Sequence, residues 1–309
     1  MDPIILFFVL GVAAGLLKSE LKLPAAVYEL ITLTLLLGIG LKGGQELARQ
    51  SALDLLPQVA AVVVTGAILC MLAFPLLRRA GGLSRADAAA VSAHYGSVSV
   101  GTYAVAAAFL AAKGIRFEEH MPLLLVSLEI PAIIVGILLA KGVRSGLRLG
   151  PVLREVVLGK SIVLLVGGML VGWIAGPGGL DPIRPLFFDL FPGILALFLL
   201  EMGLITARHL PGLKKVGPFI ILFGVAWPLV SGAAGALLGI LLGLSPGGIV
   251  MLTTMMASAS YIAAPAAIRI SVPDANPAIS LGAALGITFP FNVAIGIPLY
   301  YTVIDRLLP

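Results

Sequence analysis

Apolar residues run in long unbroken stretches along this chain, and short segments between them hold most of the charged residues. A helix that crosses a membrane needs about 20 apolar residues, whereas a transmembrane strand would alternate apolar and polar positions, as these stretches do not. The pattern therefore predicts an all-α membrane protein. Its ten expected spans are about 4–17, 24–41, 54–77, 87–112, 121–140, 160–175, 185–206, 216–243, 247–270 and 278–304.

The composition supports a membrane protein and excludes most other classes. Of 309 residues, 60% are hydrophobic and only 11% are charged, against about 25% charged in an ordinary soluble domain. The single cysteine, Cys70, and three scattered histidines give no transition-metal site. No nucleophile–base motif or phosphate loop is present, so we expect neither an enzyme nor a bound cofactor.

The distribution of basic residues predicts the orientation. With ten spans, the odd-numbered loops carry fourteen Lys and Arg residues, and the termini with the even-numbered loops carry six. Cytoplasmic loops are the ones enriched in Lys and Arg. We therefore expect a multi-pass protein of the cell (inner) membrane with both termini extracytoplasmic, and we assign the net charge of +5 to topology and membrane lipid, with no nucleic-acid partner.

The two halves of the chain repeat one another. Leu36–Leu41 and Leu199–Leu204 share one pattern at a shift of 163 residues, and the same shift carries Ser97 onto Ser260. The first and sixth spans also share a face of small residues, namely Gly11 with Gly15 and Gly168 with Gly172. Each match alone is compatible with chance, but together they favour a five-plus-five duplication.

Five spans is an odd number, so the second copy enters the membrane from the opposite side. Inverted repeats of this kind occur in secondary transporters, which bind their substrate where the copies meet. We expect a first five-helix repeat over 1–140, a short basic cytoplasmic loop over 141–159 and a second five-helix repeat over 160–309. The loop carries Lys141, Arg144, Arg148 and Arg154.

Two spans at corresponding positions are expected to be interrupted. The fourth contains Gly96–Thr102, which is rich in glycine, serine and valine, and the ninth contains Ser258–Pro265. Unpaired backbone groups at membrane depth must line a polar cavity or bind a ligand. Two broken helices crossing at the midplane would offer N–H groups to an anion and oxygens to sodium. The alternative is that these small residues only allow close helix packing.

Three ionisable residues lie deeper inside spans. Glu129 and Glu201 are candidate ion ligands or proton carriers, because intramembrane carboxyl groups are commonly functional. His94 precedes the first interruption and either lines the substrate cavity or is a hydrogen-bonded structural group.

At these motifs the sequence resembles the sodium-dependent bicarbonate transporter family known from cyanobacteria. The similarity covers nearly the whole chain and is sharpest at the two interruptions. Arg85–Ala88 followed by Tyr95–Ser99 resembles the family's fourth-span motif, and Phe289–Pro290 with Pro298–Leu299 keeps the proline spacing of its last span. The ninth-span motif is represented by Ser258–Pro265, Arg269, Pro273 and Ala275–Pro277.

The resemblance implies ten helices in a 5+5 inverted repeat, divided into gate and core domains that are each drawn from both repeats. It implies sodium-dependent bicarbonate uptake by an elevator-type movement, a homotrimer, and control by a PII-like regulatory protein. Substrate binding would fall to Gly96, Ser97, Val98, Ser99, Thr102, Ala259, Ser260 and Tyr261. Ion coupling would fall to Ser99, Ser258, Ser260, Asn276, Glu129 and Glu201.

The chain departs from the family pattern at two places. Tyr261 stands where the family commonly has an acidic residue, and Val100-Gly101 stands where Gly-Ser is common. Hard cations prefer acidic oxygens, so the change at Tyr261 keeps proton coupling through Glu129, Glu201 or His94 open as an alternative. Sodium-independent transport of another small anion, and a membrane sensor that transports nothing, are the remaining alternatives.

Overall fold

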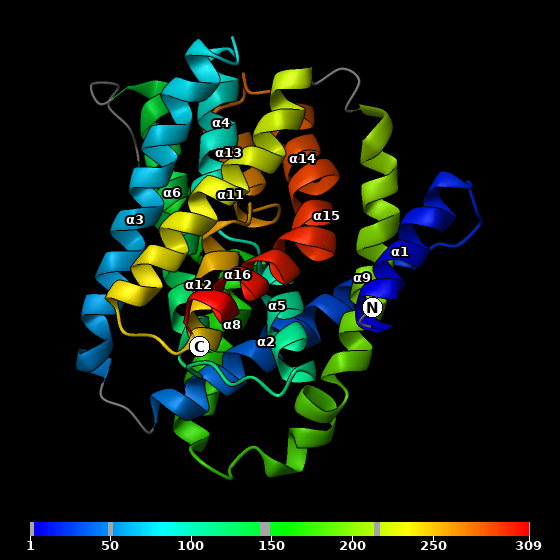
Figure 1. The fold of residues 1–309 in the computed structure, drawn as a ribbon, viewed down its shortest axis with the longest axis vertical. Helices are drawn as coiled ribbons and strands as arrows, with labels where there is room; N and C mark the ends of the chain where they lie inside the picture. The colour runs from blue at the N-terminus through cyan, green and yellow to red at the C-terminus, as the bar shows by residue number, and fades with distance from the viewer. Residues whose placement is uncertain (1–2, 49–51, 143–148, 213–216, 309) are drawn as a thin grey trace.

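The computed structural model describes residues 3–48, 52–142, 149–212 and 217–308, and these are helical with no strand among them (Figure 1). In chain order the helices are α1 (Pro3–Leu16), α2 (Ala25–Leu47), α3 (Ala52–Arg79), α4 (Arg85–Gly96), α5 (Val100–Ala112), α6 (Met121–Lys141), α7 (Leu149–Val157), α8 (Lys160–Ala175), α9 (Phe191–His209), α11 (Pro218–Leu241), α12 (Pro246–Met256), α13 (Ala263–Ser271), α14 (Pro277–Ala283), α15 (Phe289–Phe291) and α16 (Ile297–Leu307). Short 3-10 turns lie at Asp181–Ile183 and Leu210–Gly212, and wider π-helical turns at Pro185–Asp189, Ala284–Thr288 and Asn292–Gly296.

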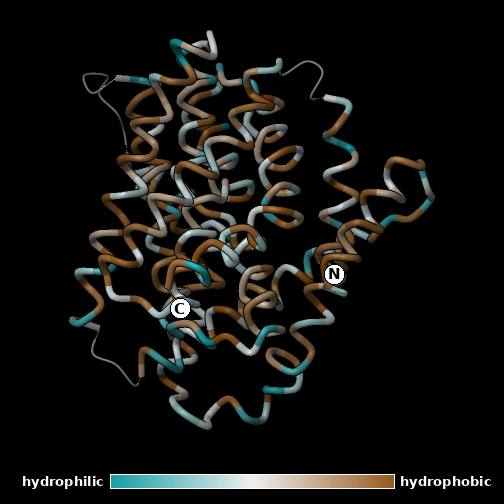
Figure 2. The backbone as a smooth tube through the Cα atoms, in the orientation of Figure 1, coloured by the Kyte–Doolittle hydropathy of each residue, from teal (hydrophilic) through white to brown (hydrophobic). Residues whose placement is uncertain are grey.

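The helices confirm an all-α membrane protein. Within the described residues, seven helical segments are long and apolar enough to cross a membrane, and α1, α8 and α12 are shorter apolar helices. Helices lie at each of the ten expected positions, while the number of complete crossings stays a prediction. Large apolar side chains are exposed on several helices, among them Leu10, Leu72, Ile174 and Leu222. Figure 2 shows that hydrophobic residues, coloured brown, occur along most of the helices.

Four helices form a bundle of their own, which we call the four-helix bundle. It consists of α1, α2, α8 and α9, in which α1 packs along α9 and α2 packs along α8 (Figure 1). Helices α3 to α6 and α11 to α16 pack with one another and form what we call the main bundle. The two bundles meet where α2 and α9 approach α5, where α2 and α8 approach α6, and where α9 packs against the π-helical turn Ala284–Thr288.

Glycines bring the helices of the four-helix bundle into close contact. A β-carbon added at Gly11 would lie 3.1 Å from the α-carbon of Gly203, and one added at Gly40 would lie 3.1 Å from that of Gly168. At Gly172 an added β-carbon would fall on the carbonyl oxygen of Leu41. The predicted faces of small residues are therefore real packing faces, which join α1 to α9 and α8 to α2.

Two regions differ from the expected elements. The stretch expected as a loop over 141–159 contains α7, whose Val156 is buried against apolar residues of α13 and α6. Arg144 and Arg148 lie outside the described residues. The last span is not one regular helix, because Pro290 and Pro298 lack the N–H that a regular turn needs, and π-helical turns precede both prolines.

Candidate functional site

Two interrupted helices cross within the main bundle. The first is α4 with α5, interrupted at 97–99, and the second is α12 with α13, interrupted at 257–262. We call these segments the first and second breaks. Helix α5 packs against α12, and α13 packs against α4, so four helix ends meet at one place. The predicted interruptions are confirmed, and their residues are buried except for Tyr261 and Ile262, which are half-buried.

Hydrogen bonds join the two breaks directly. The backbone N–H of Ser99 donates to Ser258 Oγ over 2.9 Å, and the N–H of Ser260 donates to the carbonyl oxygen of His94 over 2.8 Å. The Nδ1 atom of His94 lies 2.6 Å from the carbonyl oxygen of Ser260. These bonds satisfy main-chain groups that the helix interruptions leave without helical partners.

The serine hydroxyls that the sequence singles out lie at the helix ends. Ser99 caps α5 by accepting from the N–H of Thr102 over 3.0 Å, and Thr102 Oγ1 also donates to it over 2.9 Å. Ser258 Oγ donates to the carbonyl oxygen of Met255, and Ser260 Oγ accepts from the N–H of Ala264. The structure therefore brings together residues of both breaks, as predicted.

The four helix ends differ in polarity. Helices α4 and α12 end at the breaks and present carbonyl oxygens, which carry partial negative charge. Helices α5 and α13 begin there and present N–H groups, which carry partial positive charge. The crossing thus supplies donors suited to a small anion and oxygens suited to a hard monovalent cation.

Glu129 links the first break to the four-helix bundle. Its backbone carbonyl accepts a hydrogen bond from Ser97 Oγ over 3.1 Å, and its carboxyl Oε1 accepts from Ser161 Oγ of α8 over 3.0 Å. The second carboxyl oxygen, Oε2, is buried without a hydrogen-bond partner among the described residues. This carboxyl group lies at a contact between the two bundles and has one oxygen available to a proton or an ion.

Two predicted ion-coupling residues lie elsewhere. Asn276 is exposed, caps α14 by accepting from the N–H of Ala278, and donates its own N–H to Asp87. Asp87 is ten residues before Ser97 on α4, which is about 15 Å along a helix, so Asn276 does not belong to the crossing. Glu201 is buried on α9, with its Oε2 unpartnered in the described part of the chain.

Tyr261 turns from the second break toward the first. Its hydroxyl lies against Gly101 in the first turn of α5, where an added β-carbon would fall on the phenol oxygen. The ring packs edge-on to Phe289, with 5.7 Å between ring centroids. The residue that departs from the family pattern therefore occupies the start of α5.

Asn292 and Thr288 also contact the crossing, although they were not predicted as site residues. Asn292 Nδ2 donates to the carbonyl oxygen of Ala257 over 2.8 Å, and its Oδ1 accepts from Tyr300. Thr288 Oγ1 bonds Tyr95 of α4 over 2.6 Å. Both belong to the wide turns of the last span, so buried polar residues near Pro290 and Pro298 were the available signal.

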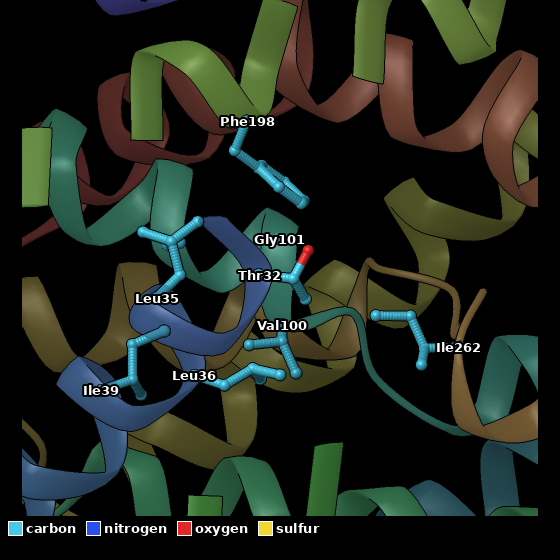
Figure 3. Close-up of a pocket in the computed structure, with 9 residues that line it drawn as sticks. Thr32, Leu35, Leu36, Ile39, Val100, Gly101, Phe198 and Ile262 are labelled. Atoms are coloured by element: carbon cyan, nitrogen blue, oxygen red, sulfur yellow. The ribbon is translucent and has the colours of Figure 1, made fainter. Parts of the chain in front are cut away.

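A small cavity lies beside the crossing, where the two bundles meet (Figure 3). Val100 and Gly101 of α5 and Ile262 of the second break form one side, and the opposite sides come from α2 and Phe198 of α9. Its walls are apolar apart from Thr32, whose hydroxyl donates to the carbonyl oxygen of Tyr28 over 2.8 Å. The α2 residues that complete the lining are Leu35, Leu36 and Ile39.

Comparison with known proteins gives a family match over nearly the whole chain. The family model described as the Na+-dependent bicarbonate transporter superfamily matches residues 3–305. That range includes both breaks and both bundles. No curated protein matches the sequence.

Proposed function

The chain belongs to the Na+-dependent bicarbonate transporter superfamily, and from this premise we propose that it takes up bicarbonate together with sodium across the inner membrane. Membership in a transporter family means that the chain is not an enzyme, as its sequence predicts. Bicarbonate and sodium are cargo in this proposal, so no resident cofactor is required.

The crossing of the two breaks is the observation that carries the proposal. Bicarbonate would bind at the N–H ends of α5 and α13, beside Ser97, Ser99 and Ser260. Sodium would bind at hydroxyl and carbonyl oxygens such as those of Ser258 and the end of α12. Because the serine hydroxyls already have internal partners, ligand binding would exchange those bonds for bonds to the cargo.

The helix packing supports a 5+5 inverted repeat. If the first five spans correspond in order to the second five, α1 corresponds to α8 and α2 to α9. The observed contact of α1 with α9 then corresponds to the contact of α8 with α2, and the contact of α5 with α12 corresponds to that of α13 with α4. The close pairs Gly11–Gly203 and Gly168–Gly40 correspond in the same way.

The two bundles support an elevator movement. In this proposal the four-helix bundle is the gate, and the main bundle is the core that carries the crossing across the membrane. The cavity between α2 and α5 has walls that are apolar apart from Thr32, so sliding would break few directional bonds there. Elsewhere between the bundles, Ser161 with Glu129 and Thr206 with the Leu285 carbonyl oxygen would exchange their hydrogen-bond partners. Alternating access would then expose the same site to each side in turn.

Uptake of radiolabelled bicarbonate into proteoliposomes, with and without an inward sodium gradient, tests the function. We expect concentrative uptake that requires sodium. The double variant Ser99→Ala/Ser260→Ala should lose it. Ser231→Ala should keep it, because Ser231 is equally buried but its hydroxyl partners in the described part of the chain are carbonyl oxygens of its own helix. An active double variant would refute the site assignment, and folded protein without uptake would refute bicarbonate as the cargo.

Proton coupling is the second candidate, and the unpartnered Oε2 of Glu129 favours it. A carboxyl group at a contact between the bundles can take up a proton on one side and release it on the other. Uptake that ignores sodium but collapses with a protonophore would support this alternative. Glu129→Gln, which keeps an acceptor for Ser161, should then abolish accumulation while exchange of labelled bicarbonate continues.

The oligomeric state, the orientation in the membrane and a regulatory partner are also part of the proposal. We propose a homotrimer in the inner membrane with extracytoplasmic termini, and a PII-like regulatory protein as a cytoplasmic partner. Mass measurement in lipid nanodiscs tests the trimer, and accessibility of a C-terminal tag in intact cells tests the orientation.

A further inference from the structure

We infer that His94 is a positioning residue, which fixes the second break relative to the first by holding both main-chain polar groups of Ser260. The carbonyl oxygen of His94 accepts from the Ser260 N–H over 2.8 Å, and His94 Nδ1 lies 2.6 Å from the Ser260 carbonyl oxygen. The side chain is fully buried in the last turn of α4. The inference rests on the proposed function only where it is tested by transport measurements.

The chemistry of this contact determines the form of the imidazole. A carbonyl oxygen can only accept, so His94 Nδ1 must carry the hydrogen and donate it to Ser260. His94 Nε2 is buried and has no hydrogen-bond partner among the described residues. Nδ1 is therefore the ring atom that makes the contact.

His94 makes two of the hydrogen bonds that join the α4–α5 helix pair to the second break, and Ser99 makes another. A single bond fixes a distance, whereas paired bonds on the N–H and C=O of one residue also fix its rotation. The hydroxyl of Ser260 in turn accepts from Ala264 N–H in the first turn of α13. His94 thus sets where α13 begins, and with it the position of the proposed anion donors.

Three variants at His94 separate positioning from simple packing. Asn places an amide N–H near the position of Nδ1 and so restores the bond, Gln places its amide near the position of Nε2, and Leu has no donor. Another histidine supplies the matched control: within the described residues, His209 Nδ1 bonds the carbonyl oxygen of Ile205 in its own helix and no other group. His209→Leu makes the same chemical change without touching the crossing.

Initial rates of bicarbonate uptake in proteoliposomes then decide the role. We expect His94→Leu and His94→Gln to raise KM about tenfold or more with little change in the maximal rate, and His94→Asn to return KM to near the wild-type value. His209→Leu should match the wild type. A purely structural role would lower the yield of active protein in all His94 variants and leave KM unchanged, and that result would overturn the inference.

A second measurement keeps this test separate from the proposed function. The ¹⁵N NMR spectrum of histidine-labelled protein in lipid should show imidazoles with hydrogen on Nδ1 for His94 and for His209, whose Nδ1 also faces a carbonyl oxygen. The His94 signal should disappear in His94→Asn, and the His209 signal should disappear in His209→Leu. If the wild-type protein does not transport bicarbonate, the proposed function is wrong. The spectrum then still tests, without transport, whether His94 Nδ1 donates to the carbonyl oxygen of Ser260. A spectrum with hydrogen on Nε2 of His94 would overturn the inference even if transport is normal.

Discussion

Ser258 uses one hydroxyl to hold both breaks together. It accepts from the N–H of Ser99 and donates to the carbonyl oxygen of Met255. Ser258→Ala would leave the buried Ser99 N–H unpaired, which costs about 1–3 kcal/mol. We expect a lower unfolding temperature in detergent than for Ser231→Ala, whose hydroxyl bonds only its own helix. Equal temperatures for the two variants would contradict the hydrogen bond between the breaks.

His120, just before α6, should make stability depend on pH. Burial lowers its pKa, and the neighbouring Glu118 carboxylate raises it by less. The unfolded histidine, with a pKa of about 6.5, then binds a proton more readily than the folded one, so stability falls as the pH drops through that value. His120→Gln keeps a donor for Gln58 and should flatten the loss of unfolding temperature between about pH 7 and pH 5. An unchanged slope would contradict this assignment.

The sequence predicts some residues of the crossing and not others, for a physical reason. The serines of the breaks can be recognised in the sequence, namely Ser97, Ser99, Ser258 and Ser260. Polar residues that disfavour a helix are unusual inside an apolar span, because the backbone groups they leave unpaired need other partners. Asn292 is visible as a polar residue inside an apolar span, but its contact with Ala257 is not, and the apolar residues of α2 around the cavity give no signal at all. The role of each depends on which distant helix it meets. A single chain without its fold does not reveal such contacts.

At the scale of elements, the glycines of α8 set how closely it approaches α2. A β-carbon at Gly172 would fall on the Leu41 carbonyl oxygen, whereas one at Gly167, on the same helix, would meet nothing within 4 Å. We expect Gly172→Ala to destabilise the protein by about 1–3 kcal/mol through overpacking. Gly167→Ala should be neutral or slightly stabilising. Thermal unfolding in one detergent compares them, and similar effects of the two changes would argue against this packing.

Some helix boundaries are set by local residues that oppose a helix, and others are set by packing against distant helices. The breaks were predicted from glycine, serine and proline, which oppose a helix whatever surrounds them. Helix α7 was not predicted, because its nine residues are short for a helix and Val156 is stabilised by burial against α13 and α6. The irregular last span was not predicted, because Pro290 and Pro298 were noted only for their spacing and the position of the wide turns depends on packing.

For the whole molecule, the central question is whether the two bundles move against each other. Leu36 of α2 and Ala104 of α5 line the same small cavity from opposite bundles. A reducible cross-linker between Leu36→Cys and Ala104→Cys, in a Cys70→Ala background, should abolish bicarbonate uptake, and reduction should restore it. Measuring the same liposomes before and after reduction separates the cross-link from damage by the substitutions.

The matched control lies within the four-helix bundle. Gln45 of α2 and Trp173 of α8 are on adjoining turns, since a β-carbon at Gly172 would lie 3.1 Å from the Gln45 nitrogen and one at Gly44 would lie 2.8 Å from the Trp173 nitrogen. Cross-linking Gln45→Cys to Trp173→Cys joins two helices of the gate, which an elevator movement leaves in the same place relative to each other, so uptake should persist. Uptake that survives the Leu36–Ala104 cross-link would refute sliding, because alternating access would then proceed with the bundles fixed. Loss of uptake in both pairs would instead show that the four-helix bundle itself must deform.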